Sequence, residues 1–371
     1  MLKNKILSTG MTGRMRNIFI SRNRASHAGF LSGKHREPLT DTNLLLTITI
    51  CMFFGMYALA ILIWGGGFLN FQQFLNLFNF NAPLIIIACG LTIVMIAGGI
   101  DISVGGVIAL VTMSCVVYLN SQNGSVLGTL CLALGIGIAF GFVQGYLVAY
   151  LEIQPFIITL AGMFFARGMT TIVNGEPAKV AHGDFLALHQ MQIDIPLHFL
   201  GTYGRTGNFI PARIELTAII ALAVVLVVFV LLKWSRFGRN LYAVGGNKQS
   251  ALMLGINVKR TKFYSHLLCG LLAGIAGFTF LMINASANPT GDARFFEMRA
   301  IASSIIGGTL LTGGVGNVIG TLFGSLSLLT ITQIVVTSGL TKPWWQQITT
   351  GAMLCFFILL QSVILARRSR R

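Results

Sequence analysis

The sequence predicts an all-helical, polytopic integral membrane protein with about ten transmembrane helices. Hydrophobic residues make up 54% of the 371 residues and charged residues only 10%, whereas a soluble domain usually carries about 25% charged residues. Several apolar runs reach the roughly 20 residues that a helix needs to cross a hydrocarbon core about 30 Å thick. The 43 glycines favour closely packed helices, and the sequence lacks the dyad alternation of a membrane β-barrel.

Ten apolar segments, taken in chain order, mark the predicted crossings. They lie at 44–64, 82–99, 104–119, 126–150, 156–174, 214–233, 263–283, 299–311, 315–337 and 344–366. The eighth is short for a helix that must cross alone. Together the ten segments predict one transmembrane domain over 44–366, with polar ends at 1–43 and 367–371.

Lysine and arginine are clustered along the chain. In a soluble protein the net charge of +16 would suggest a nucleic-acid partner. Here 19 of the 26 basic residues lie in three short segments: before residue 44, in Lys233–Lys262 and in Arg367–Arg371. Such clusters mark cytoplasmic segments of membrane proteins, so the charge is assigned to membrane topology and no nucleic-acid partner is expected.

This topology places both termini and the loop 234–262 in the cytoplasm, with six crossings before Lys233 and four after Lys262. It places 175–211, whose charges are of mixed sign, outside as a periplasmic loop. The basic, acid-poor residues 1–43 are expected to form a cytoplasmic tail. Their composition also resembles a transit peptide, and a later start at Met11 or Met15 is a further alternative.

The six cysteines all fall within apolar runs, and none has the spacing of metal ligands. They are interpreted as small packing residues rather than as disulfide partners. No metal or cofactor is therefore expected for this chain.

The segment "GGIDISVGG", residues 98–106, contains Asp101, the only charged side chain between Asp41 and Glu152. A carboxylate at a helix centre costs about 2.5–3.5 kcal/mol on insertion scales, so Asp101 is a candidate proton or cation site. The alternative is a helix cap in which Asp101 or Ser103 accepts hydrogen bonds from the first N–H groups of the next helix. Gly99 and Gly105 complete this candidate structural or gating turn.

A second glycine-rich stretch, "GGTLLTGGVGNVIG" from Gly307, echoes the first. In the predicted topology each stretch follows an inward-running helix and precedes an outward-running one. An internal parallel repeat and chance both account for the echo.

The basic loop 234–262 contains the pattern of a short helix over Asn247–Leu254. Asn247 is an expected N-cap, and Gly255 is an expected left-handed terminator. A loop that only fixed topology would not need such a helix.

Five segments resemble, in order and spacing, the permease subunits of bacterial monosaccharide ABC importers, the ribose, arabinose, galactose and xylose group. They are "GIDISVGGVIAL", "PFIITLAGMFFARG", "FGRNLYAVGGNKQSALMLGINVKR", "EMRAIASSIIGGTLLTGGVG" and "WWQQITTGAMLCFF". The resemblance covers about 44–366, and "FIITLAGMFFARG" and "IIGGTLLTGGVGNVIGTLFG" are most similar to the galactofuranose-type branch. The chain departs from the family pattern in residues 1–43, in Lys248-Gln249-Ser250 and in Met298-Arg299.

The resemblance implies an ABC importer permease fold in the bacterial cytoplasmic (inner) membrane. It implies three protein partners: a cytoplasmic ABC ATPase, a second permease copy or homologous permease, and a periplasmic sugar-binding protein. The chain itself is expected to be no enzyme, because no G-x-x-x-x-G-K-[ST] phosphate loop occurs in the sequence, so ATP is left to the partner. The resemblance assigns ATPase coupling to Gly238, Arg239, Tyr242, Gly245, Gly246, Asn247, Ala251 and Gly255.

A sugar pathway needs polar side chains on the crossings. The candidates are Asn79, Asn81, Gln144 and Asn174. Each is equally compatible with an interhelical hydrogen bond, which contributes about 0.6 kcal/mol on average.

Two other functions remain open from the sequence. An ion-coupled secondary transporter using Asp101 would need further charges inside the bundle, and only Arg167 also lies clearly within a predicted crossing. A membrane scaffold or channel could use the basic loop to bind anionic lipid, at about 1 kcal/mol per Lys or Arg.

Overall fold

The computed structural model describes residues 38–121, 124–195, 201–203 and 209–369. The chain divides into two units, 1–41 and 42–371. Most of the predicted tail 1–43 lies outside the described residues, as do the last two residues of the predicted tail 367–371. The first described helix begins at Pro38, six residues before the first predicted crossing.

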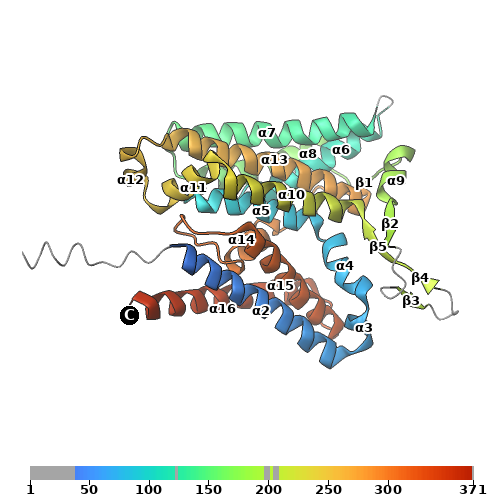
Figure 1. The fold of residues 1–371 in the computed structure, drawn as a ribbon. Helices are drawn as coiled ribbons and strands as arrows, with labels where there is room; N and C mark the ends of the chain where they lie inside the picture. Colours follow the sequence, from blue (N-terminus) through green and yellow to red (C-terminus); the bar gives the residue numbers. More distant parts are fainter. Residues whose placement is uncertain (1–37, 122–123, 196–200, 204–208, 370–371) are drawn as a thin grey trace, which may run out of the picture. The chain divides into compact units, whose positions relative to one another are not determined.

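Each of the ten predicted apolar segments overlaps a helix (Figure 1). The helices are α2 (Pro38–Trp64), α5 (Ala82–Ile96), α6 (Val104–Leu119), α7 (Val126–Ala149), α8 (Pro155–Val173), α10 (Leu216–Trp234), α13 (Val258–Asn284), α14 (Phe296–Ile306), α15 (Val318–Thr337) and α16 (Pro343–Ser369). Shorter helices lie between them: α3 (Gly66–Leu69), α4 (Phe71–Asn79), α9 (Gly183–His189), α11 (Arg236–Gly246) and α12 (Lys248–Met253). The predicted all-helical membrane fold is confirmed.

Fewer of these helices are long enough to cross a membrane than the ten predicted. Among the described residues, six helices have the length and composition of a full span, and α4 with α5, bent by 56° at the break between them, brings the number to seven if the pair is counted as one span. α14 has 11 residues and covers only about 16 Å at 1.5 Å per residue. The segment predicted at 299–311 is therefore not a full-length crossing helix. An irregular segment follows α14, since Gly307 to Asn317 form turns rather than helix.

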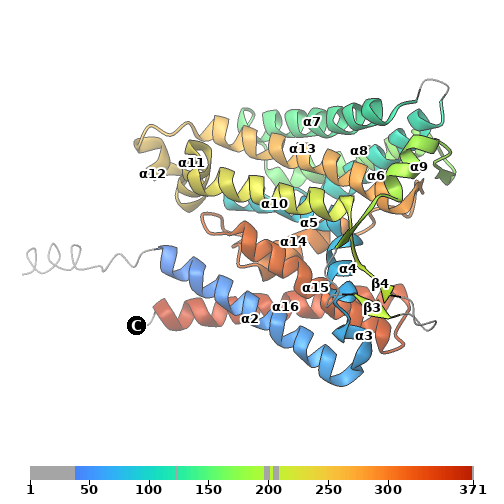
Figure 2. The ribbon, with the colours of Figure 1, turned by 45° about the vertical axis from the view of Figure 1, so that its right-hand side comes forward.

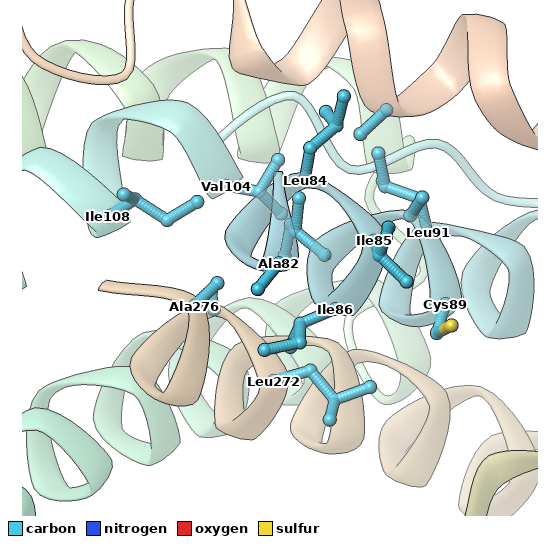
Figure 3. Packing of buried hydrophobic residues seen from close by; sticks show 14 of the residues in the cluster. Ala82, Leu84, Ile85, Ile86, Cys89, Leu91, Val104, Ile108, Leu272 and Ala276 are labelled. Atoms are coloured by element: carbon cyan, nitrogen blue, oxygen red, sulfur yellow. The ribbon is translucent and has the colours of Figure 1, made fainter. Parts of the chain in front are cut away.

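The core is built around α5. All 15 residues of α5 are buried, as expected for a helix that is apolar all round. Figure 3 shows Ile86 and Cys89 of α5 with Leu272 and Ala276 of α13, and Val104 and Ile108 of α6 in the same cluster. α14 and α15 also contact α5, so this helix holds the other elements together.

α7 and α13 lie side by side along most of their length (Figure 2). Gly137, Gly141 and Gly145 follow each other at four-residue spacing and face α13. A Cβ at Gly141 would lie 2.7 Å from His266 O, and a Cβ at Gly274 would lie 2.5 Å from Ala133 O. This is the small-residue packing that membrane helices use for close approach.

Short antiparallel strands lie at the end of the helices opposite α11 and α12 (Figure 1). β1 (Ala178–Lys179) pairs with β6 (Ser286–Ala287), β2 (Gln192–Ile195) with β5 (Ala212–Glu215), and β3 (Thr202–Tyr203) with β4 (Phe209–Ile210). Asn79 holds this region to α4, since its Nδ2 donates to Arg213 O (3.2 Å) and its Oδ1 accepts from Glu215 N (3.0 Å).

Candidate functional site

The predicted short helix in the basic loop is present as α12, and its predicted ends are confirmed. Asn247 Oδ1 accepts from Ser250 N (2.9 Å) at the N-terminus. Gly255 adopts φ 76° after the last turn, its N–H donates to Leu252 O, and Ile256 N–H donates to Ala251 O. These two bonds form a Schellman motif, which favours glycine at the left-handed position.

α12 rests on a small apolar base and leaves its tip free. Ala251 is buried with Val244 of α11 and Val258 of α13. Leu252, Met253 and Leu254 are 53%, 90% and 77% exposed. An apolar tip on a capped helix is unusual for a solvent-facing loop and is typical of a contact surface for another protein.

An Asn247→Ala substitution is expected to lower the stability of α12 by about 1 kcal/mol, because the Ser250 N–H loses its side-chain acceptor. Hydrogen–deuterium exchange of 247–255 measures this directly, with faster exchange confined to this segment. Gln249→Ala, at an exposed position of the same helix, is the control and should leave exchange unchanged. Equal exchange in both variants would contradict the capping role.

α11 is fixed to the end of α10. Ser235 Oγ accepts from Gly238 N (3.0 Å), and Arg239 Nη1 donates to Trp234 O (3.2 Å). A Cβ at Gly238 would collide with Leu232 O, so the turn between α10 and α11 needs glycine there. These contacts give the loop a defined position relative to α10.

Two glycine-rich turns meet beneath α11. The first glycine turn is residues 97–103, between α5 and α6, and the second is residues 307–317, between α14 and α15. Gly314 N donates to Ile96 O (2.9 Å) at the start of the first turn, and a Cβ at Gly313 would lie 2.9 Å from Gly98 Cα. The two sequences that echo each other are therefore in direct contact.

α11 packs onto both turns. Tyr242 hydroxyl donates to Gly316 O (2.9 Å), and burial raises the pKa of Tyr242 to about 12, so the phenol keeps its proton at neutral pH. A Cβ at Gly245 would collide with Ile96 O and lie 2.5 Å from Gly314 N, whereas a Cβ at Gly246 would meet nothing within 4 Å. α11 therefore contacts both glycine turns at once.

Asp101 lies in the first glycine turn and is 1% exposed. Its Oδ1 accepts from Ser103 N (2.9 Å) and Ser103 Oγ (2.7 Å). Ser103, the N-cap residue of α6, makes no side-chain cap bond itself. The carboxylate thus closes the turn on the N-cap residue and does not bond the first-turn N–H groups that a simple cap would satisfy.

Ser103 also links this turn to α7. Its Oγ lies 3.1 Å from Gln144 Oε1, and Gln144 Nε2 has no partner in this arrangement. A hydroxyl carries one proton, which Asp101 takes, so the opposite amide orientation, with Nε2 donating to Ser103 Oγ, gives this contact one donor and one acceptor. Of the four predicted pathway residues, only Gln144 is brought to the Asp101 turn.

His266 is the residue near Asp101 that sequence reasoning missed. Its Nδ1 lies 3.8 Å from Asp101 Oδ2, and both side chains are 2% exposed. The distance is too long for a hydrogen bond. A histidine within the apolar segment 263–283 was the available signal, because a buried polar ring needs a polar neighbour.

The other predicted pathway residues make local contacts elsewhere. Asn79 holds β5, as described above. Asn81 Nδ2 donates to Leu77 O (3.3 Å), and Asn174 Nδ2 donates to Glu176 O (3.0 Å) at the end of α8. The structure does not gather these three side chains with Gln144.

The remaining glycines of the predicted gating turn have different surroundings. Gly99 N donates to Val94 O (3.0 Å). A Cβ at Gly105 would collide with Oε2 of the buried Glu297. Arg167 of α8 holds the segment just before α14, since it donates to Asp292 O (2.6 Å) and Ala293 O (2.9 Å). Gly105 therefore admits the first turn of α14 next to α6.

Comparison with known proteins gives one family over most of the chain. The family model described as "Branched-chain amino acid transport system / permease component" matches residues 73–358. No solved structure matches the chain significantly.

Several known permeases match along most of their length. The inner membrane ABC transporter permease protein YjfF of Escherichia coli is 38% identical over 86% of this chain and 92% of its own. The fructose import permease protein FruG of Bifidobacterium longum is 32% identical over 92% of this chain and 96% of its own. The ribose import permease protein RbsC of Escherichia coli is 35% identical over 70% of this chain and 77% of its own.

Proposed function

Because the chain belongs to the family of branched-chain amino acid transport system permease components, and because its relatives include ribose and fructose import permeases, we propose that it is the transmembrane permease subunit of an ATP-driven monosaccharide importer. It forms the translocation pathway in a multi-pass arrangement in the inner membrane. Its substrate is a monosaccharide, and the galactofuranose-type assignment stays a prediction.

The exposed apolar tip of α12 is the observation that carries this proposal. A permease of this kind needs a rigid element that contacts a separate ATPase. Leu252, Met253 and Leu254 are three apolar side chains, and burying each one fully against a partner contributes roughly 1.5–3 kcal/mol to association. The caps at Asn247 and Gly255 hold the tip in shape before the partner binds, which lowers the entropic cost of association.

Coupling then runs from α12 through α11 to the two glycine turns. The ATPase moves α12, and Gly245 and Tyr242 of α11 carry that movement to the ends of α5 and α14. These two helices pack on each other and on α15, so a shift at their ends changes the bundle. The ATP-bound and the ATP-free ATPase each favour a different helix arrangement of the permease. The pathway therefore opens to one side of the membrane in one state and to the other side in the other state.

The remaining partners follow from the same role. A second permease copy or a homologous permease completes the pathway, and a periplasmic binding protein delivers the sugar on the side of the short strands. The α11–α12 end and both termini are cytoplasmic under the positive-inside rule. The chain makes and breaks no bonds itself, and the partner ATPase binds and hydrolyses ATP.

The ion-coupled alternative is not favoured. Its carboxylate, Asp101, is occupied by two hydrogen bonds from Ser103. In a coupling site the carboxylate would face a path to water, but Asp101 is buried.

The double variant Met253→Asp/Leu254→Asp tests the proposal. We expect the variant to weaken association with the ATPase by about tenfold or more, since 1.4 kcal/mol corresponds to tenfold in Kd. Copurification of the ATPase and ATP-dependent uptake of labelled monosaccharides into proteoliposomes with the binding protein measure both parts. The control is Gln249→Ala on the same helix.

Three outcomes are informative. Loss of copurification and uptake in the double variant alone supports the role of α12. Unchanged copurification would exclude the tip as the contact surface. A wild-type complex that copurifies but transports no monosaccharide would overturn the substrate class.

A further inference from the structure

A cavity of about 280 Å³ lies between α12, the turn joining α7 to α8, and the start of α13. Its polar lining consists of Lys248, Lys259, Lys262, Glu152 and Gln154. We call it the lysine pocket. Two of its residues, Lys248 and Leu252, belong to α12; the others lie outside the coupling route described above.

The charge of the lysine pocket is not balanced from within. Three ammonium groups face one carboxylate, that of Glu152, whose Oε2 lies 4.0 Å from Lys248 Nζ. Both of these side chains are more than half exposed, so their ion pair contributes little and leaves two positive charges uncompensated.

Two helix N-termini add to this positive potential. α8 begins at Pro155 and α13 at Val258, and both residues line the pocket. Each helix N-terminus carries the equivalent of about half a positive charge, and its N–H groups favour phosphate. Asn257 Oδ1 already caps α13 by accepting from Arg260 N (2.9 Å), whereas α8 receives no side-chain cap from Gln154, so a ligand does not have to displace one at α8.

The rest of the lining is apolar and borders exposed hydrophobic side chains. Val148, Ile153 and Leu252 form part of the wall. Leu151, Phe156 and Ile157 of the adjoining turn and helix are 55%, 47% and 56% exposed, as expected for residues that contact acyl chains. The basic lining of the pocket therefore lies directly beside exposed apolar surface.

We propose that the lysine pocket binds a phosphate group, carried either by an anionic phospholipid or by a soluble phosphate compound. The apolar border fits a lipid headgroup, and basic pockets between membrane helices at the cytoplasmic side bind such headgroups. A bound phosphate bridges Lys248 of α12 to Lys259 and Lys262 of α13, and so fixes α12 against the α7–α8 turn. Phosphate binding at this site is separate from sugar transport and does not depend on which substrate is carried.

The test compares full-length protein in nanodiscs of phosphatidylcholine with and without phosphatidylglycerol. Native mass spectrometry counts the retained phosphatidylglycerol, and inorganic phosphate is added as a competitor. We expect Lys259→Gln/Lys262→Gln to weaken phosphatidylglycerol binding about tenfold. The matched control Arg236→Gln/Arg260→Gln removes two cations from the same loop outside the lining and should change binding less than twofold.

A second variant tests the pocket without removing its cations. Glu152→Gln deletes the one competing carboxylate and should tighten phosphate binding about threefold. If millimolar inorganic phosphate competes with phosphatidylglycerol, the bound phosphate group comes from a soluble compound. If it does not compete, the bound group belongs to the lipid. If neither the lysine variant nor Glu152→Gln differs from the control pair, the proposal is overturned.

Discussion

We expect Gly245→Ala to reduce ATP-driven sugar uptake about a hundredfold, although it adds a single methyl group. The new Cβ would collide with Ile96 O and lie 2.5 Å from Gly314 N, and both are backbone atoms that no rotamer change can move aside. Overpacking of this kind costs about 1–3 kcal/mol. The least costly relief is to lift α11 from the two glycine turns, which breaks the proposed path from the ATPase to α5 and α14.

The neighbouring residue supplies the control. A Cβ at Gly246 would meet nothing within 4 Å, so Gly246→Ala has the same chemistry without the collision. Uptake into proteoliposomes, ATPase copurification and ATP hydrolysis are measured for both variants. Gly245→Ala should keep the ATPase bound and hydrolysing while transport fails. Equal uptake by both variants would show that close contact at Gly245 is not needed for coupling.

The ends of α12 could be predicted from sequence because their causes are local. Asn247 bonds an N–H three residues along the chain, and Gly255 adopts a left-handed conformation that glycine tolerates best. Both signals lie within the short stretch that they shape. The apolar segments could be located for the same reason, because each is defined by the hydrophobicity of consecutive residues.

The meeting of the two glycine turns could not be predicted. Gly98 and Gly313 are more than two hundred positions apart. Nothing in the sequence around them distinguishes them from other glycines of membrane segments. Only the packing of α5 against α14 brings their backbones together. The short length of α14 has a related cause, because Gly307 packs against the backbone of Gly320 and Thr321 in α15 and the chain turns there.

Polar residues on apolar segments were the least predictable part of the candidate site. Asn79, Asn81 and Asn174 each have hydrogen-bond partners near the ends of helices, which sequence alone does not distinguish from a substrate path. His266 of α13 was overlooked because the nearby carboxylate, Asp101, lies in the turn between α5 and α6, far away in sequence. The function of these residues depends on which elements pack together, and the composition of the chain does not show this.

We expect Asp101→Leu to remove most of the folded protein and Asp101→Asn to retain ATP-driven uptake within about threefold. Leucine leaves the buried N–H of Ser103 without its acceptor, at about 1–3 kcal/mol, and only Gln144 Oε1, 3.1 Å from Ser103 Oγ, remains to accept from the hydroxyl. Asparagine keeps an oxygen at the same place and removes only the charge.

This pair of variants separates a structural carboxylate from an ion-coupling one. Thermal unfolding in detergent measures stability, and proteoliposome uptake with and without a proton or sodium gradient measures coupling. A structural Asp101 predicts a stable, gradient-independent Asp101→Asn transporter. An ion-coupling Asp101 predicts that the same variant folds but cannot transport, because a neutral amide neither releases a proton nor attracts a cation. The hydrogen bonds from Ser103 need an oxygen acceptor rather than a charge, and the first result is therefore the expected one.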